Sequence, residues 1–222
     1  MYSHFFDGLF GNDEPVETSI KIALIGDGST GKTSYFNRIV SGDSTEYRFS
    51  KNYDATQGCN ICQIEMMIGK HKVTVHIFDT AGQEKFGMLR DSYLMGADGI
   101  ILMYDVMDLG SKQNVITKWL PEIKKIMTKT RMSNIPVAVV GNKCDRIDRR
   151  KHIEKTTLGF RVSDLVSNYD ARQGMIEQHM ISVKGDENLM TPIIWLLQII
   201  LKKNCKNIKK TEKKPFISYC NK

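Results

Sequence analysis

Ile20-Lys-Ile-Ala-Leu-Ile25 leads directly into Gly26-Asp-Gly-Ser-Thr-Gly-Lys-Thr33, and this stretch decides the fold. The apolar run is typical of a buried strand, and Lys32 to Val40 follows with the pattern of a helix. The spacing G-x-x-x-x-G-K-[ST] lets the backbone wrap a phosphate chain with its N–H groups pointing inward, at a helix N-terminus that carries partial positive charge. The stretch therefore predicts a phosphate-binding loop, in which Lys32 reaches the β- and γ-phosphates and the Thr33 hydroxyl binds Mg²⁺.

Strand and helix patterns alternate along the rest of the chain. Alternating apolar and polar residues predict a hairpin of two strands, 60–68 and 72–78, joined across Gly69-Lys70. Apolar runs predict further strands over 99–106, 135–140 and 179–183. Helical spacing joins Val115, Trp119, Ile123 and Ile126, and a last apolar helix is expected over 189–201. We therefore expect an α/β fold with a mostly parallel six-stranded sheet, one antiparallel strand and helices on both faces.

A second candidate segment, Asp79-Thr-Ala-Gly-Gln83, follows the second strand of the hairpin. A carboxylate at the end of an apolar strand can hold Mg²⁺, here through water. The Gly82 N–H can approach a γ-phosphate, and the Gln83 amide can orient an attacking water. Taken alone, the segment also suits an ordinary exit from a strand into a loop.

A third segment, Asn142-Lys-Cys-Asp145, follows the apolar run 135–140. A fixed carboxylate can accept both N–H groups of the Watson–Crick edge of guanine, whereas adenine presents an acceptor there and leaves the carboxylate unpaired. Asp145 is therefore predicted to select the base, with Lys143 packing over the ring. The backbone N–H groups of Ser182-Val183-Lys184, after the last strand, can reach the base carbonyl. Because all these segments follow strands, we expect them to meet at one edge of the sheet.

These motifs, in this order, make the segment from Ile20 to Leu201 resemble a Ras-superfamily small GTPase. The resemblance implies a GTP/GDP switch that binds GTP with Mg²⁺ and hydrolyses it slowly to GDP and phosphate, with Gln83 and Lys32 as catalytic residues. It also matches Thr56 to the family's switch threonine, which binds Mg²⁺ and senses the γ-phosphate, and Phe49 to the aromatic residue that stacks on guanine.

The resemblance implies three sets of contacts. The phosphates would be bound by Asp27, Gly28, Ser29, Thr30, Gly31, Lys32, Thr33, Thr56 and Gly82. Guanine would be bound by Phe49, Asn142, Lys143, Asp145, Ser182, Val183 and Lys184. Mg²⁺ would be held by Thr33, Thr56 and, through water, Asp79. An exchange factor, a GTPase-activating protein and effectors are the implied partners.

Within the superfamily, three stretches resemble Ran: 26–33, 53–58 and 83–93. Ran-like function implies nucleocytoplasmic transport, with transport receptors among the partners. By contrast, 96–102 and 104–106 resemble Rab proteins, so a lipid-anchored switch in vesicle traffic is an alternative. Val183 replaces the alanine of the family's S-A-K motif, and the chain ends in lysines where Ran is acidic. A nucleotide-stabilised binding module that does not cycle is a further alternative.

The net charge of +7 lies entirely in residues 202–222, which hold eight Lys and one Glu, so the rest of the chain is balanced. We therefore expect an N-terminal leader (1–19), a GTP-binding domain (20–201) and a basic, disordered tail (202–222). The balanced charge of the body predicts that it binds no nucleic acid directly. We also expect the body to be a monomer. The tail is either a solvated end or a segment that makes weak electrostatic contact with anionic membranes. Five cysteines without a secretory or transmembrane segment predict an intracellular protein of the cytoplasm or nucleus.

Overall fold

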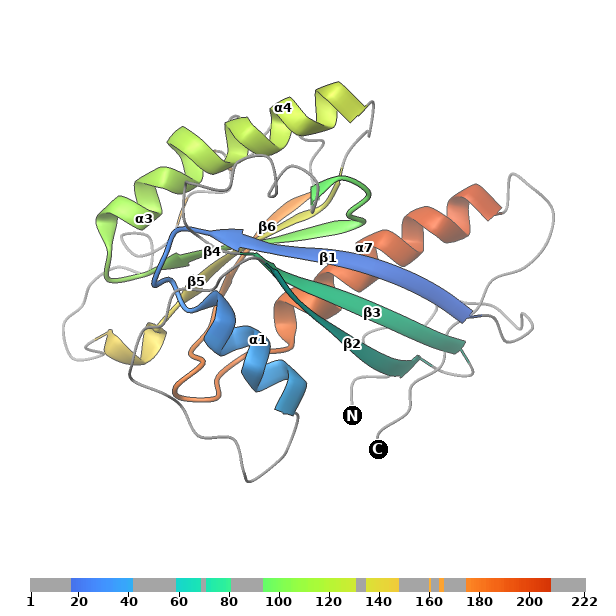
Figure 1. Ribbon diagram of the computed structural model, residues 1–222, viewed down its shortest axis with the longest axis horizontal. Coiled ribbons are helices and arrows are strands. Elements are labelled where there is room, and N and C mark those ends of the chain that lie inside the picture. Colours follow the sequence, from blue (N-terminus) through green and yellow to red (C-terminus); the bar gives the residue numbers. More distant parts are fainter. Residues whose placement is uncertain are drawn as a thin grey trace.

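The sheet is mixed, with a single antiparallel pairing among the strands that the structure describes (Figure 1). The computed structural model describes residues 17–41, 59–68, 71–80, 94–130, 135–147, 160, 164–165 and 175–208. The strands are β1 (Glu17–Gly26), β2 (Cys59–Ile68), β3 (His71–Thr80), β4 (Gly99–Asp105), β5 (Val137–Asn142) and β6 (Ile176–Met180). Their order across the sheet is β2-β3-β1-β4-β5-β6, and β2 alone runs antiparallel to its neighbour. The predicted α/β fold is thereby confirmed.

Helices cover both faces of this sheet. They are α1 (Lys32–Ser41), α3 (Leu109–Asn114), α4 (Leu120–Thr130) and α7 (Thr191–Ile208), with a π-helical turn η3 (Val115–Trp119) and a 3-10 turn η4 (Cys144–Arg146). α3, η3 and α4 follow one another without a break and lie on one side of the sheet, whereas α1 and α7 lie on the other (Figure 1).

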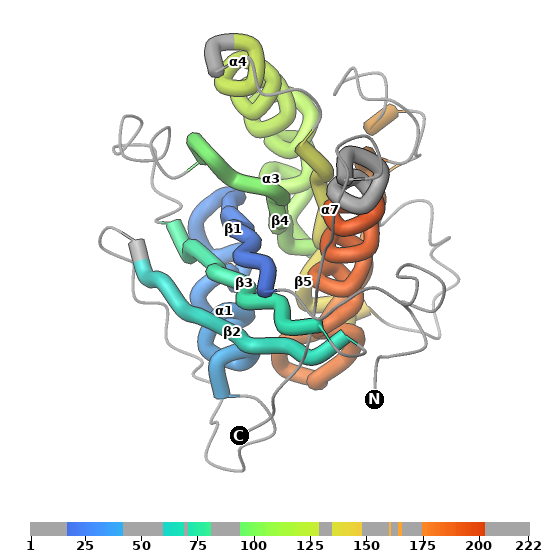
Figure 2. Tube along the Cα trace, turned by 90° about the vertical axis from the view of Figure 1, so that its right-hand side faces the viewer, coloured from blue at the N-terminus to red at the C-terminus, as the bar shows by residue number. Residues whose placement is uncertain are grey.

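The two faces are built by the alternation of side chains along β1. Ile22 and Leu24 are fully buried in the apolar cluster under α1 and α7. Ala23 and Ile25 are fully buried in the second cluster, under η3 and α4. Because successive strand residues point to opposite faces, an uninterrupted apolar run is what a strand with helices on both sides requires. Figure 2 shows β1 inside the sheet, between β3 and β4.

The strand register brings the ends of four strands to one edge. Leu24 of β1 pairs with Asp79 of β3, and Gly26 pairs with Met103 of β4. Asp105, the last residue of β4, pairs with Asn142 at the end of β5. The segments that the sequence singled out therefore leave the sheet side by side, at the edge where sheets of this type bind ligands.

Several element boundaries differ from the sequence expectations. The last strand was expected over 179–183, but β6 is Ile176–Met180. Ile181 still contacts β5, since its N–H donates to the Gly141 carbonyl, and it is buried in the apolar cluster under α1 and α7. Ser182, also buried, begins a turn in which it bridges to Glu187. A buried turn carries the same apolar signal as a buried strand, which explains the shift.

The outer elements also extend beyond the expected domain limits. β1 begins at Glu17, inside the segment expected as a leader, and α7 continues to Ile208, inside the segment expected as a tail. No glycine or proline interrupts residues 193–208, and lysines near a helix C-terminus are favoured by the helix dipole. Within the described part of the chain, none of the helices is both long enough and apolar enough to span a membrane.

Candidate functional site

The loop between β1 and α1, Gly26–Thr33, is called the phosphate loop below. Two of its glycines are required by their surroundings. Gly26 has φ +136°, and a Cβ there would overlap the backbone carbonyl oxygen of Met103. Gly31 has φ +95°, and a Cβ there would overlap the Asn142 side-chain nitrogen. The loop therefore owes its tight path to contacts with β4 and β5, made before any ligand is considered.

Lys32 points back into this loop. Its Nζ donates to the carbonyl oxygens of Gly26 at 2.9 Å and of Asp27 at 2.6 Å, and the Thr30 hydroxyl donates to the same Asp27 carbonyl at 2.9 Å. Burial lowers the pKa of Lys32 to about 8, although the carboxylates of Asp79 and Asp27 act in the opposite direction. A desolvated ammonium held among backbone carbonyls can transfer its hydrogen bonds to phosphate oxygens.

Thr33 and Asp79 form the second part of the edge. The Thr33 hydroxyl donates to Asp79 Oδ2 at 2.8 Å. Burial raises the pKa of Asp79, while Thr33, Lys32 and Asn60 favour its charged form. The other oxygen, Oδ1, is buried and receives no hydrogen bond from the described residues. A hydroxyl and a carboxylate with an unsatisfied buried oxygen supply oxygen ligands of the kind that Mg²⁺ prefers.

Asn142 joins the phosphate loop to the segment after β5, Asn142–Asp145, which is called the base loop. Its side-chain N–H₂ donates to the Thr30 carbonyl at 3.0 Å. Its side-chain oxygen accepts from the backbone N–H of Lys143 at 2.7 Å and of Val183 at 3.2 Å. One buried amide thus connects three segments that are far apart in the sequence. The Val183 N–H, predicted to reach a base carbonyl, donates here to Asn142.

Asp145 and Ser182 are brought together, as the prediction of a shared base site requires. The Ser182 hydroxyl is fully buried and donates to Asp145 Oδ1 at 2.6 Å, and it accepts from the Gly185 N–H at 2.8 Å. This contact fixes the direction of an otherwise exposed carboxylate at the sheet edge. Lys184 follows as an exposed residue.

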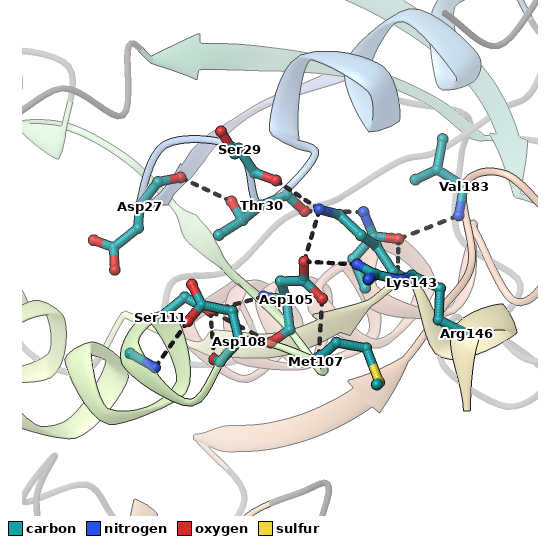
Figure 3. Close-up of polar contacts among 12 residues, drawn as sticks. Asp27, Ser29, Thr30, Asp105, Met107, Asp108, Ser111, Lys143, Arg146 and Val183 are labelled. Carbon is teal, nitrogen blue, oxygen red and sulfur yellow. Dashed lines mark hydrogen bonds and ion pairs between the residues drawn. The ribbon is translucent and has the colours of Figure 1, made fainter. Parts of the chain in front are cut away.

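Asp105 is a residue of this edge that the sequence reasoning did not select. Lys143 Nζ lies 2.7 Å from Asp105 Oδ2 and donates to the Ser29 carbonyl at 2.8 Å (Figure 3). Arg146 approaches the same carboxylate oxygen at 3.6 Å. The available signal was that Asp105, like Asp79, is an acidic residue closing an apolar strand. It lies in the Rab-like stretch 104–106 but in none of the three predicted nucleotide-binding segments.

The Asp27 side chain takes a direction that the sequence did not predict. Its carboxylate accepts from Asn114 Nδ2 at 2.7 Å and from Trp119 Nε1 at 3.0 Å, with Lys118 Nζ at 3.7 Å. These three partners lie on or beside η3, whose wider turn brings positions 114 and 119 to one carboxylate. Contact between Asp27 and a phosphate, which stays a prediction, would have to come from its backbone.

The remaining predicted residues are only partly placed. Gly28 and Ser29 are exposed at the tip of the phosphate loop, and Ser29 has φ +61°. Phe49, Thr56, Gly82 and Gln83 lie outside the described residues. Their roles in stacking, Mg²⁺ binding and water orientation stay predictions.

Comparison with known protein families agrees with this geometry. A sequence model of the Ras family matches residues 21–187 of the 222 residues, from β1 to the turn after β6. Members of that family are small GTPases, which bind GTP or GDP, typically with Mg²⁺, and hydrolyse GTP. The matched segment includes the phosphate loop, Asp79, the base loop and Ser182. The chain therefore belongs to the Ras family of small GTPases.

Proposed function

We propose that this chain is a GTP/GDP switch that binds GTP with Mg²⁺ at the edge just described and hydrolyses it slowly to GDP and phosphate. The observation that carries the proposal is the Asn142 bridge, which holds the phosphate loop and the base loop against each other. A nucleoside triphosphate presents a base at one end and phosphates at the other, so two joined loops of these types suit it.

The base loop supports guanine as the base. Asp145 keeps a fixed direction through Ser182, and a fixed carboxylate matches the two N–H groups of guanine. Adenine offers no N–H groups at those positions, and where the bound base excludes water, a charged group left unpaired costs about 1–3 kcal/mol or more. Lys143 would cover the ring with its carbon stem, and Ser182, Val183 and Lys184 would approach the base carbonyl.

The metal ligands of the proposal are Thr33, Thr56 and, through water, Asp79. When bound, Mg²⁺ would neutralise charge on the β- and γ-phosphate oxygens. The buried, unsatisfied Oδ1 of Asp79 supports this assignment, because a buried carboxylate oxygen without a donor is costly unless a ligand satisfies it.

For hydrolysis, the proposed roles follow the family. Gln83 would orient the attacking water, Gly82 and Thr56 would contact the γ-phosphate, and Lys32 would stabilise the charge that develops on the phosphate oxygens. No arginine of the described edge points into the phosphate loop, which supports slow turnover that a partner protein accelerates.

Single-turnover hydrolysis of GTP tests the proposal. The parent protein should release phosphate slowly with Mg²⁺ and not after Mg²⁺ is chelated. Gln83→Leu should still bind GTP but hydrolyse it at least tenfold more slowly, because the water-orienting amide is lost while the phosphate loop is intact. Equal rates for the two proteins would place that role elsewhere. A parent protein that binds GTP without any turnover would instead favour the non-cycling binding module.

The subfamily proposal is Ran-like, and it rests on the sequence stretches 26–33, 53–58 and 83–93. Transport receptors are the partners that it implies. The Rab-like alternative rests on 96–102 and 104–106. The two differ in their partners and in the need for a lipid anchor. Affinity capture with the protein loaded with GDP or with a non-hydrolysable GTP analogue, together with the intact mass of the native protein, distinguishes them.

A further inference from the structure

Asp105 lies where three segments of the proposed site meet. It ends β4, and its side chain is only 10% exposed. One carboxylate oxygen, Oδ2, faces two cations, Lys143 at 2.7 Å and Arg146 at 3.6 Å. The other oxygen, Oδ1, accepts from the backbone N–H of Met107 at 2.9 Å. The two oxygens therefore have different partners: Oδ1 hydrogen-bonds the chain after β4, and Oδ2 pairs with the cations of the base loop and of the residue that follows it.

Lys143 is held in a conformation that needs such support. Its backbone has φ +68° and ψ +33°, in the left-handed region. Ser29, with φ +61°, also has a positive φ. Left-handed backbone costs about 1–2 kcal/mol for each non-glycine residue and persists where the surroundings enforce it. The Lys143 ammonium donates to the carbonyl of Ser29, so one hydrogen bond joins the two strained residues (Figure 3).

We propose that Asp105 is a positioning residue for guanine nucleotide, which acts by holding Lys143 against the phosphate loop. This inference rests on the function proposed above, in which the Lys143 stem covers the base. With its Nζ fixed at Asp105 and Ser29, the stem has both ends anchored and lies along the edge of the sheet. The base face is thus prepared before the nucleotide arrives, which lowers the entropic cost of binding.

Loss of the Asp105 charge should release Lys143. An asparagine keeps the oxygen that serves Met107, but it places a neutral amide before two cations. Lys143 and Arg146 would then repel each other without compensation. Because the Lys143 side chain is 30% exposed, its ammonium can turn into solvent. The stem would leave the base face, and nucleotide would dissociate faster while the phosphate contacts persist.

A double-mutant cycle on nucleotide release tests this proposal. Release of a fluorescent GDP analogue is measured for the parent, Asp105→Asn, Lys143→Met and the double variant. We expect Asp105→Asn to speed release about tenfold, in keeping with the loss of a charge-assisted contact. In the Lys143→Met background, the same change should alter the rate by less than about twofold, because the residue through which Asp105 acts is already gone.

Two control variants separate positioning from general destabilisation. Asp98→Asn makes the same substitution just before β4, where Asp98 Oδ2 accepts from the Lys21 N–H at the opposite edge of the sheet. Arg146→Gln removes the second, more distant cation, whose side chain is 54% exposed. Both should release nucleotide within about twofold of the parent. If Asp105→Asn does not fold, Asp105→Glu keeps the charge at a different reach and takes its place in the cycle.

Each outcome decides between the proposals. Equal acceleration by the Asp105 change in both backgrounds, or no acceleration in the parent, overturns the inference about Asp105 and leaves the proposed function intact. Acceleration of the same size by Asp98→Asn shows that loss of stability is the cause, and also overturns it. A parent protein that binds no guanine nucleotide overturns the proposed function and this inference together.

Discussion

Replacing Gly31 with alanine should break the connection between the phosphate loop and the base loop. The new Cβ would overlap the side-chain nitrogen of Asn142, which donates to the Thr30 carbonyl at 3.0 Å. The backbone at position 31 has φ +95°, so the alanine is also held in a conformation that L residues rarely adopt. The two costs arise separately and can be measured separately.

The expected loss in the free energy of unfolding is about 2–3 kcal/mol. The backbone contributes about 1–2 kcal/mol, the usual cost of a left-handed non-glycine residue. Displacement of Asn142 adds about 1 kcal/mol for the hydrogen bond to Thr30. Gly96 is the matched control, because it has φ +74° and a Cβ added there would meet no atom of the described residues within 4 Å. Gly96→Ala should therefore cost the backbone term alone.

Urea unfolding followed by tryptophan fluorescence measures these costs. Each variant is unfolded at two concentrations of Mg²⁺ and GDP, so that the contribution of nucleotide binding can be subtracted. In an Asn142→Ala background the overlap disappears, and Gly31→Ala should then cost no more than Gly96→Ala. Equal costs for Gly31→Ala and Gly96→Ala in the parent background would show that Asn142 does not oppose a side chain at position 31.

Three further predictions follow from other parts of the molecule. Asp145→Asn should shift the base preference from guanine toward xanthine nucleotides, because the edge of xanthine carries a carbonyl where guanine has an amine. Competition binding measures this preference, and an unchanged preference would count against Asp145 as the residue that selects the base. Deletion of residues 203–222 should leave GTP turnover within about twofold but abolish salt-sensitive co-sedimentation with anionic vesicles, because that segment holds seven Lys and one Glu and so carries most of the net charge. A large loss of turnover would show that the segment acts on the nucleotide site. Burial lowers the pKa of His179 to about 4, and this side chain lies 3.8 Å from the Glu177 carboxylate and beside the Trp195 ring. Because His179 binds a proton more readily in the unfolded chain, the free energy of unfolding should fall as the pH drops from 7 toward 4. His179→Gln should remove about 1–2 kcal/mol of that loss at pH 5, measured by urea unfolding of both proteins, and an identical pH dependence would contradict it.

The sequence predicted strands and motifs well where the local pattern of apolar residues matches the burial that the tertiary structure imposes. The apolar run before Gly26 predicted a buried strand, which is β1. The glycines and Lys32 that follow this run predicted the phosphate loop. The alternation of strands with helices predicted a mostly parallel six-stranded sheet, and the strand pairing confirms it. What pattern could not supply was the exact end of a buried segment, as at β6, because the buried residues Ile181 and Ser182 after it have the same apolar signal as a strand.

The contacts between motifs could not be predicted, because they depend on register. Nothing local indicates that Asn142 reaches Thr30, or that Gly31 lacks a side chain because Asn142 occupies its space. Asp105 lies in none of the three predicted nucleotide-binding segments, and its contacts with the base loop appear only when β4 and β5 align it with Asn142. The direction of the Asp27 carboxylate likewise depends on η3, and a one-turn π-helix has no pattern of its own in the sequence.

The central claim is that the joined phosphate and base loops hold a guanine nucleotide. The most direct measurement is the identity and amount of nucleotide released when the freshly purified native protein is denatured, with chromatographic separation of guanine and adenine nucleotides. The protein should release GDP or GTP at about one molecule per chain, and this nucleotide should be retained with Mg²⁺ and lost when Mg²⁺ is chelated. Adenine nucleotide in its place, or a protein that neither retains nor takes up GDP, would contradict it.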